Sequence, residues 1–411
     1  MYYERVLEQA ITKTSKTFPV VLVTGPRQAG KTTLLTKMAD KNRTIVSLDN
    51  PTIRGLAKED PGLFLQRYKP PVLIDEVQYA PELFVYIKMY VDEHKNNGDF
   101  WLTGSQAFQM MENITESLAG RVGIVRLSGL SNAEVQQTFH GEFVVDMESL
   151  IERREASKAM DAADIFQRIY RGSMPRLYEN PEIDLEQYYE SYIETYITRD
   201  IKELTKVADE MLFLNFVRAA AARTASNVNF TELADEVGIS SPTAKQWLSL
   251  LVTSGVVLLI QPFSNNALHR VIKTPRMYFM DTGLCAYLAG WNSPEALERG
   301  AMNGAFFETW VVTEIYKSYI HMGKNPPLYF YRDSNNKEID LLICQNATLY
   351  PIEIKKGTQP KNATKNFSVL KKFADADNGQ KALAGNGAVI CLAPDVIPID
   401  RMNCYVPAWI I

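Results

Sequence analysis

The sequence predicts an α/β protein with more than one domain, and three observations support this prediction. A glycine-rich loop at residues 25–33 stands between an apolar run and a helical pattern. A second apolar run, within residues 70–81, ends on two adjacent carboxylates, and three strand-like runs follow one another in residues 327–360. A chain of 411 residues is also longer than one hydrophobic core usually serves, so two or three domains are expected.

The composition is ordinary for a globular chain, with 46% hydrophobic and 22% charged residues. The net charge of -4 excludes an overall basic field for nucleic acid, although a local basic face remains compatible with it. No run reaches the roughly 18 apolar residues of a membrane span, and the N-terminus lacks the apolar region of a signal peptide. Isolated cysteines predict reduced thiols in a cytoplasmic protein and no zinc site; they are Cys285, Cys344, Cys391 and Cys404.

The first element is a strand, VVLVTG, followed by the loop GPRQAGKTT and the helical pattern TTLLTKMADK. The loop fits the phosphate-binding pattern G-x-x-x-x-G-K-[ST], in which backbone N–H groups and a helix N-terminus hold phosphates. Lys31 is expected to reach the β- and γ-phosphates of ATP, and Thr32 to ligate Mg²⁺. The alternative is a chance glycine turn. The predicted nucleotide-binding residues are Gly25, Pro26, Arg27, Gln28, Ala29, Gly30, Lys31, Thr32 and Thr33.

The second element, PPVLIDEVQYAP, is an apolar strand that ends in Asp75 and Glu76. A carboxylate at the end of a strand beside a phosphate loop holds the Mg²⁺ hydration shell, which is the role predicted for Asp75. Glu76 is placed to polarise an attacking water. Taken alone, such a pair is a solvated strand end, but after a phosphate-binding loop it predicts Mg²⁺-dependent ATP hydrolysis.

The third strand, DFWLTGSQ, ends in Thr103, Gly104 and Ser105. The Ser105 hydroxyl is a candidate to sense the γ-phosphate or to orient water. The alternative is an ordinary strand-to-helix turn in which Ser105 caps the helix.

These segments together resemble a known family. GPRQAGKTTLL, VLIDEVQYAPELF, WLTGSQ and ESLAGRVGIVRLSGLS are similar to the AAA+-type ATPase module of prokaryotic ATPases that carry a C-terminal DUF4143 domain. The resemblance continues through RGSMPRLYE, YIETYITRDI, YFMDTGLCAYL and FYRDSNNKEIDLLI, so it covers nearly the whole chain. It implies a parallel-sheet ATPase domain at residues 1–140.

In such modules an arginine after the third strand often acts as a finger or sensor, and Arg121 matches this position, with Arg126 as the lesser candidate. The alternative for Arg121 is a surface ion pair. If Arg121 acts on a neighbouring subunit, the active form is a homo-oligomer. Arg171 and Arg199 also match residues typical of the family, with nucleotide sensing or structural pairing as the two interpretations.

Residues 141–228 have a helical pattern that is interrupted at Gly172 and Pro175. An aromatic and apolar stripe within it is expected to pack in the core. This stripe comprises Tyr188, Tyr192, Ile193, Tyr196 and Ile197.

Residues 229–300 predict a winged helix-turn-helix. A helix capped near Thr231 ends at Gly238, a second begins at Ser240, and the strands VVLLI and MYFM follow. The alternatives are DNA contact and packing against protein. The residues predicted to contact DNA are Ser241, Thr243, Lys245, Gln246, Trp247, His269, Arg270, Lys273 and Arg276.

Residues 301–411 predict a helix followed by three strands, carrying Glu308, Asp340, Glu353 and Lys355. Their order resembles the Glu–Asp–Glu-x-Lys arrangement of the PD-(D/E)xK nuclease fold. Alternate strand residues share a face, so Glu353 and Lys355 belong to one site. Asp340 and Glu353 would ligate a second Mg²⁺ with Glu308, and Lys355 would act on water. The alternative is a binding domain in which Lys355 forms a structural ion pair.

Three functions compete at this point. The first is an ATPase that moves a winged helix and a nuclease-like domain on DNA. The second is a regulatory ATPase switch whose C-terminal half binds protein partners. The third is a phosphate-transferring kinase for a small metabolite. The sequence shows no pattern for a lid or an acceptor pocket, and a kinase would not need the predicted helix-turn-helix.

Overall fold

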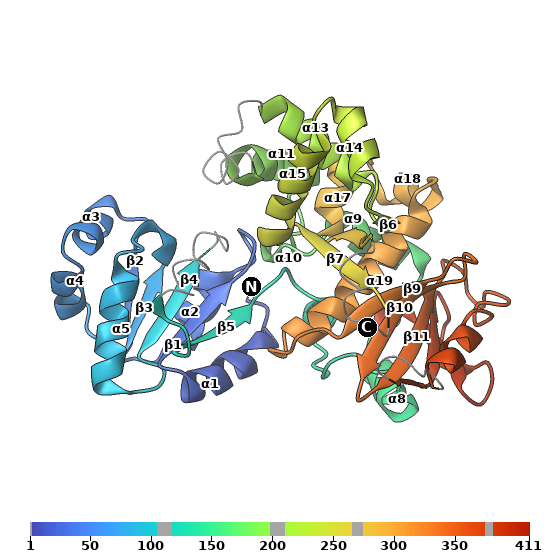
Figure 1. Cartoon of the computed structure of the whole chain (residues 1–411), viewed down its shortest axis with the longest axis horizontal. Coiled ribbons are helices and arrows are strands. Elements are labelled where there is room, and N and C mark those ends of the chain that lie inside the picture. The colour runs from blue at the N-terminus through green and yellow to red at the C-terminus, as the bar shows by residue number, and fades with distance from the viewer. Residues whose placement is uncertain (1, 105–116, 198–209, 265–273, 375–380) are drawn as a thin grey trace.

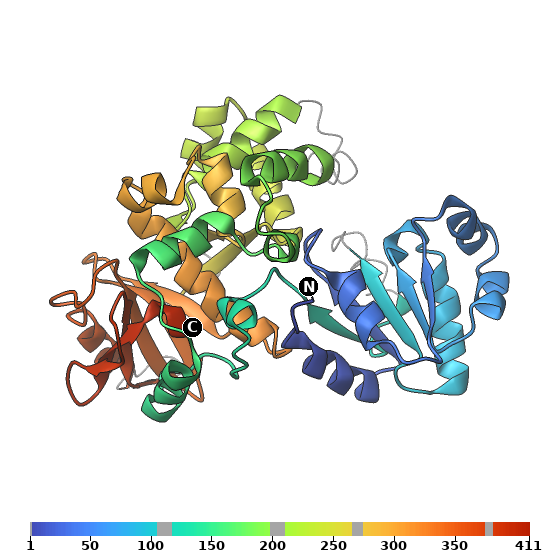
Figure 2. The same ribbon diagram turned by 180° about the vertical axis from the view of Figure 1, so that it is seen from behind.

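The computed structural model describes residues 2–104, 117–197, 210–264, 274–374 and 381–411. The N-terminal sheet and its helices form one lobe, and the rest of the chain forms a larger second lobe (Figure 1). The same separation is visible from behind (Figure 2). In both views the N-terminus lies near the junction of the two lobes.

The first lobe is built on a five-stranded sheet in which every pairing is parallel, in the order β2-β3-β4-β1-β5. Strands β1 and β4 are buried along their whole length, as expected of apolar strands covered on both faces. The strands are β1 (Val20–Thr24), β2 (Thr44–Ser47), β3 (Val72–Asp75), β4 (Phe100–Gly104) and β5 (Val122–Arg126).

Helices cover both faces of this sheet. Val21 and Val23 pack in a core with residues of α1 and α2, whereas Val20 and Leu22 pack in a separate core with residues of α3, α4 and α5. This division follows from the alternation of side chains along a strand. The helices are α1 (Leu7–Thr17), α2 (Lys31–Met38), α3 (Pro51–Glu59), α4 (Pro61–Arg67) and α5 (Leu83–His94), with the short turn η1 (Val77–Tyr79).

The second lobe has one large core that draws residues from the whole stretch 143–411. It therefore joins the segments that the sequence separates at residues 228 and 300, and the division into 1–140, 141–228, 229–300 and 301–411 stays a prediction. The stripe residues Tyr188, Tyr192 and Ile193 pack in this core, as predicted. The helices between β5 and β7 are α7 (Asn132–Gln136), α8 (Met147–Ala156), α9 (Ala162–Arg171), α10 (Pro175–Glu179), α11 (Leu185–Tyr192), η2 (Ile193–Ile197), α13 (Glu210–Ala221), α14 (Phe230–Val237) and α15 (Ser241–Thr253).

A mixed sheet of ten strands runs through this lobe, in the order β14-β15-β13-β11-β10-β9-β7-β8-β6, with β12 paired to β11. Strand β7 pairs in parallel with β9, so the strands that follow α15 continue into the C-terminal sheet. The strands are β6 (Ser226–Asn227), β7 (Val257–Pro262), β8 (Arg276–Phe279), β9 (Leu328–Arg332), β10 (Glu338–Gln345), β11 (Thr348–Ile354), β12 (Leu383–Ala384), β13 (Gly387–Cys391), β14 (Ile397–Pro398) and β15 (Asn403–Pro407). The remaining helices are α17 (Thr282–Leu288), α18 (Pro294–Arg299), α19 (Asn303–Ile320), η3 (Phe367–Phe373) and η4 (Ala408–Ile410).

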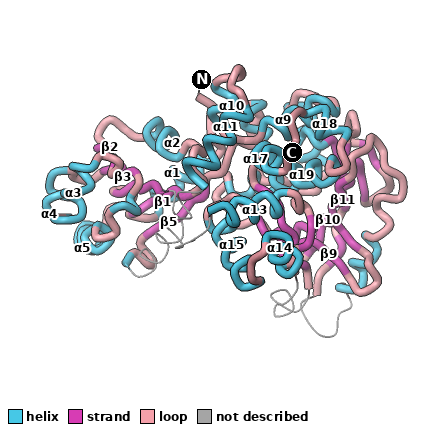
Figure 3. Tube along the Cα trace, turned by 90° about the horizontal axis from the view of Figure 1, so that it is seen from above, coloured by secondary structure: helices cyan, strands magenta, loops and turns pink. Residues whose placement is uncertain are grey.

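The helices α13, α14 and α15 lie together beside strands of the second sheet (Figure 3). The cap of α14 differs from the prediction, because the side chain of Asn229 accepts hydrogen bonds from the N–H groups of Thr231 and Glu232. Asn229 has the short amide needed at this position, so it caps the helix in place of Thr231. Gly238 ends α14 with a φ of 78°, and Ser240 caps α15, both as predicted.

Candidate functional site: a phosphate-binding loop, its cleft and a carboxylate cluster

The phosphate-binding loop connects β1 directly to α2. A Cβ atom on Gly25, whose φ is 149°, would lie 1.9 Å from the carbonyl oxygen of Leu127, so only glycine fits there. Gly30 has a φ of 90° and stands immediately before α2. The Lys31 ammonium donates hydrogen bonds to the carbonyl oxygens of Gly25 and Pro26, each over 2.9 Å. The loop thus brings a cation and a helix N-terminus together, which is the chemistry that phosphate binding requires.

Asp75 lies beside the loop, at the ends of three neighbouring strands. Its Oδ1 atom accepts hydrogen bonds from the Thr32 hydroxyl (2.6 Å) and the Thr103 hydroxyl (2.5 Å), and its Oδ2 atom accepts one from Ser47 (3.2 Å). Hydroxyl and carboxylate oxygens are the ligands that Mg²⁺ prefers. Thr32 and Asp75 therefore fit the metal that the motif implies.

Glu76 follows Asp75 in a left-handed backbone conformation, with a φ of 55°. Such a conformation is unfavourable for a glutamate and often occurs at functional sites. The Glu76 N–H donates to the Thr103 hydroxyl (3.1 Å), and the Gln78 side chain donates to the Glu76 carboxylate. Gln78, which the motif does not include, therefore orients the residue predicted to act on water.

A cavity of about 720 Å³ opens beside the loop and is lined by both lobes. The predicted residues Lys31, Thr32 and Glu76 line it. Several lining residues were not predicted, because they lie outside the phosphate-binding loop and the Asp75–Glu76 pair, the two patterns that carry the nucleotide chemistry. These are Tyr2, Tyr3 and Arg5 from the N-terminal segment, Asp49, Arg54 and Tyr79 from the first lobe, and Leu130, Pro175, Arg176 and Glu179 from the second.

Arg121 lies far from the loop of its own chain. It immediately precedes β5, whose opposite end pairs with Thr24 at the start of the loop. Its guanidinium forms a two-point ion pair with Asp92 on α5, with distances of 2.5 and 3.0 Å, and both side chains are substantially exposed. Within one chain Arg121 is therefore a surface ion-pair partner, and a role as a finger requires a second subunit. The lesser candidate, Arg126, lies at the loop end of β5.

Three more residues were predicted to act near the nucleotide, and the structure describes only Arg171 among them. Arg171 donates hydrogen bonds to the carbonyl oxygens of Leu177 (2.7 Å) and Pro181 (3.2 Å), so it supports the backbone around α10. It does not line the cavity beside the loop. Ser105 and Arg199 lie outside the described residues.

The four polar residues predicted in the C-terminal region come together in a second site. The Lys355 ammonium lies 3.1 Å from Asp340 Oδ2 and 2.8 Å from Glu353 Oε1. Burial and the neighbouring Asp340 carboxylate raise the pKa of both Glu308 and Glu353 to about 7. Among the described residues, the Oε2 atom of Glu353 is buried with no hydrogen-bond partner.

Arg276 enters this cluster from β8. Its guanidinium lies 3.1 Å from Glu308 Oε1 and 3.9 Å from Asp340 Oδ1, and it also pairs with Glu338. The prediction that Arg276 contacts DNA from a wing is wrong, because this side chain is buried and already paired with carboxylates. Within the described parts of the chain, no three Cys, His, Asp or Glu side chains are arranged to hold a metal ion. A second Mg²⁺ site at Asp340 and Glu353 stays a prediction.

The helix predicted to read DNA, α15, is only partly available for contact. Trp247 is 6% exposed and packs edge-on against Phe213 and Phe216, with ring centroids 5.2 and 5.5 Å away. Trp247 is therefore a core residue, and its prediction as a DNA contact is wrong. Lys245 and Gln246 are exposed. His269, Arg270 and Lys273 lie outside the described residues.

A parallel sheet that presents a phosphate-binding loop and Asp75 at one edge is the fold of a P-loop ATPase, and it supports ATP binding. Three family models match successive parts of the chain. An AAA domain matches residues 17–136, the domain of unknown function DUF8612 matches residues 162–295, and the domain of unknown function DUF4143 matches residues 303–411. The chain belongs to the family of AAA+-type proteins with a C-terminal DUF4143 domain, which confirms the resemblance seen in the sequence.

Individual proteins are also similar to this chain. Uncharacterized proteins of Mycobacterium tuberculosis and Mycobacterium bovis are each 30% identical over 345 residues, covering 83% of this chain and 71% of theirs. A Walker-type ATPase of Pyrococcus abyssi is 16% identical, with a TM-score of 0.44 over 70% of this chain and 96% of that one. AMPPCP-bound DnaA from Aquifex aeolicus is 13% identical, with a TM-score of 0.30 over 60% and 86% of the two chains. In the part of the chain that the structure describes, no helix has both the length and the apolarity needed to cross a membrane.

Proposed function

We propose that this chain binds ATP with Mg²⁺ in the cleft beside the phosphate-binding loop and hydrolyses the nucleotide. The observation that supports this most directly is the 2.6 Å hydrogen bond between the Thr32 hydroxyl and Asp75. It places a phosphate-loop hydroxyl and a strand-end carboxylate together, where a magnesium ion bound with ATP is held in P-loop enzymes. The cavity of about 720 Å³ beside them falls in the size range of small-molecule sites.

Each residue then has a defined role. Mg²⁺, when bound, would neutralise negative charge on the phosphate oxygens. Lys31 leaves the loop carbonyls that it now contacts and binds phosphate oxygens instead. Glu76 orients an attacking water and accepts a proton from it, while Gln78 holds the Glu76 carboxylate in place.

This proposal is tested by ATP binding and ATP turnover in two variants. Lys31→Ala should abolish nucleotide binding, whereas Glu76→Gln should retain binding and lose turnover. Glu82→Gln, an exposed glutamate at the start of α5, is the matched control and should behave like the wild type. Hydrolysis by Glu76→Gln at the wild-type rate would show that Glu76 does not activate water.

We further propose that nucleotide state acts through the second lobe on DNA. The order α13, β6, α14, α15, β7 and β8 supports a winged-helix unit, and exposed Lys245 and Gln246 on α15 are suited to contact phosphates or base edges. Fluorescence anisotropy with duplex DNA should show affinity that falls steeply with salt. Lys245→Ala should weaken this binding, and Lys58→Ala, an exposed lysine on α3, should not. Salt-independent or absent binding would count against a DNA role.

A second function is favoured by the pairing of Arg276 with carboxylates of the C-terminal cluster. Arg276 and Lys355 already form ion pairs with the carboxylates there, which suits a regulatory ATPase switch whose second lobe binds protein and does not cut nucleic acid. The two functions differ in metal binding. A nuclease site predicts that Mg²⁺ or Mn²⁺ raises the melting temperature and that Asp340→Ala removes the rise. Metal-dependent DNA nicking that disappears in Lys355→Ala would establish cutting, whereas no metal effect and no cutting would favour the switch.

A further inference from the structure

The phosphate-binding loop is contacted at three positions by the N-terminal segment and by the second lobe. The carbonyl oxygen of Ala29 accepts a hydrogen bond from Arg5, and the side chain of Gln28 accepts one from the Tyr188 hydroxyl on α11. Pro26 lies against Gly255, the turn after α15, where an added Cβ would stand 3.4 Å from the proline ring. The loop is therefore packed directly against the rest of the chain.

Arg5 makes the most extensive of these contacts. Its side chain is almost completely buried, and its donors are shared among three segments. Nη1 donates to the Ala29 carbonyl over 3.0 Å, and Nε donates to Glu134 Oε1 over 3.0 Å. Nη2 donates to the carbonyl oxygens of Ser128 (2.8 Å) and Gly129 (3.2 Å). One guanidinium thus joins the loop to the segment that leaves the first sheet.

The peptide plane explains how this contact bears on phosphates. In a trans peptide the C=O and N–H groups point in opposite directions. The Arg5 hydrogen bond fixes the carbonyl of Ala29, so it also fixes the direction of the Gly30 N–H, which belongs to the same peptide. Gly30 lines the nucleotide cleft. Arg5 therefore determines which way a phosphate-binding N–H of the loop can point.

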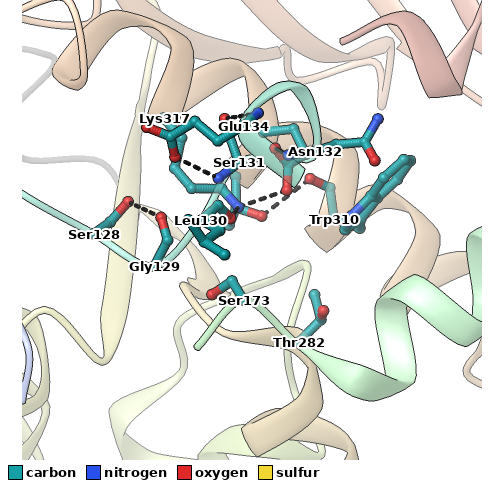
Figure 4. Close-up of polar contacts among 12 residues, drawn as sticks. Ser128, Gly129, Leu130, Ser131, Asn132, Glu134, Ser173, Thr282, Trp310 and Lys317 are labelled. Atoms are coloured by element: carbon teal, nitrogen blue, oxygen red, sulfur yellow. Dashed lines mark hydrogen bonds and ion pairs between the residues drawn. The ribbon is translucent and has the colours of Figure 1, made fainter. Parts of the chain in front are cut away.

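The segment on the other side of Arg5 is tied to α19 by buried hydrogen bonds (Figure 4). The Asn132 N–H donates to Glu314 (2.8 Å), and the Lys317 ammonium donates to the Leu130 carbonyl (2.9 Å). Near the end of α19, His321 Nε2 lies 2.9 Å from the Ser128 hydroxyl. The same helix carries Glu308 of the carboxylate cluster.

We propose that Arg5 is a positioning residue that orients the phosphate-binding loop and links phosphate occupancy to α7 and α19 in the second lobe. This inference rests on the proposed nucleotide binding. A phosphate that draws the Gly30 N–H toward itself turns the Ala29 carbonyl, and Arg5 carries this movement to Glu134 and the 128–134 segment. By reciprocity, a ligand that shifts α19 changes the affinity of the loop for nucleotide.

The test uses Arg5→Lys, because a lysine keeps the positive charge opposite Glu134 but lacks the planar fork that reaches three segments. The matched control is Arg154→Lys, since Arg154 pairs with Asp395 on the exposed surface, away from the loop. Mg²⁺-ADP binding is measured by calorimetry, and amide hydrogen exchange of residues 132–136 and 313–321 is followed with and without Mg²⁺-ADP. ADP is chosen because it engages the loop without turnover.

In the wild type and in Arg154→Lys, bound ADP should slow exchange in both segments by about fivefold or more, the lower end of ordinary allosteric coupling. In Arg5→Lys, ADP should still bind while this slowing is lost. If Arg5→Lys fails to fold, Ser128→Ala removes only the hydroxyl bonded to His321 and should lose the slowing at residues 317–321.

Two outcomes overturn the linkage alone: the wild type binds ADP without slower exchange, or Arg5→Lys retains the full slowing. Failure of the wild type to bind ADP or ATP overturns the proposed function and the linkage together. A structural role for Arg5 without coupling would lower stability equally in the presence and absence of ADP.

Discussion

Substitution of His321 should alter how the stability of the protein depends on pH. His321 is buried at the end of α19, with Nε2 2.9 Å from the Ser128 hydroxyl and Nδ1 3.4 Å from a Glu134 carboxylate oxygen. Burial lowers the pKa of the imidazole from its ordinary value of 6.5 to about 4, although Glu134 acts in the opposite direction. Arg5 and Lys317 also disfavour a further positive charge there.

The direction of the effect follows from this lowered pKa. Between about pH 6.5 and pH 4 the unfolded chain binds a proton on His321 and the folded chain does not. The unfolded state is therefore favoured progressively as the pH falls through this window. The difference between 6.5 and about 4 corresponds to about 3 kcal/mol of unfolding free energy, which is lost by pH 4 and fully retained above pH 6.5.

The assay is urea unfolding of the wild type and of His321→Gln at pH 7.5, 6, 5 and 4.5. The wild-type unfolding free energy minus that of His321→Gln should fall by about 2 kcal/mol or more over this range, because only the wild type carries this group. Other titrating residues are common to both proteins, so they cancel in the difference. A difference that does not change with pH would refute a buried neutral imidazole at this position.

Three further predictions concern the fold and the nucleotide site. Gly25→Ala should abolish nucleotide binding and lower the melting temperature, because the added Cβ would overlap the Leu127 carbonyl oxygen 1.9 Å away; normal binding in calorimetry would contradict this. Trp247→Ala should cost about 3–5 kcal/mol in chemical unfolding, as for other buried aromatic residues, and a loss below about 1 kcal/mol would show that the side chain is not in the core. Arg121→Ala should slow ATP hydrolysis without changing ATP affinity, and more so at concentrations where subunits associate; an equal loss of affinity would make it a ground-state ligand. Asp92→Asn is the control: it removes the ion pair but keeps Arg121, so it should hydrolyse ATP at the wild-type rate.

The nucleotide site could be predicted from the sequence because its signals are local. Lys31 lies inside one motif and Asp75 ends one apolar strand, so the shared direction of parallel strands alone places them at the same edge of the sheet. Arg5 and Arg276 could not be predicted in this way, because their partners lie far away in the sequence. Arg5 contacts residues more than a hundred positions away in the sequence, and Arg276 meets Glu308 on α19 and Glu338 on β10, which no local pattern connects to β8. The burial of Trp247, in contrast, could be predicted from the sequence, since Ala244, Leu248 and Leu251 at helical spacing mark the buried face of its helix.

The parallel pairing of β7 with β9 also determines where this chain can be divided. A fragment that begins at residue 301 would contain β9 without its neighbour β7, leaving a row of main-chain N–H and C=O groups unpaired along a sheet edge. Exposed edges of this kind recruit strands from other molecules, so such a fragment should aggregate even though it contains all the residues matched by the DUF4143 model. It would also leave Glu308 and Glu338 without their ion-pair partner Arg276. A cut between residues 127 and 134 crosses neither sheet, yet it would separate Arg5 from its buried partner Glu134, so neither boundary leaves both pieces with their buried charges paired.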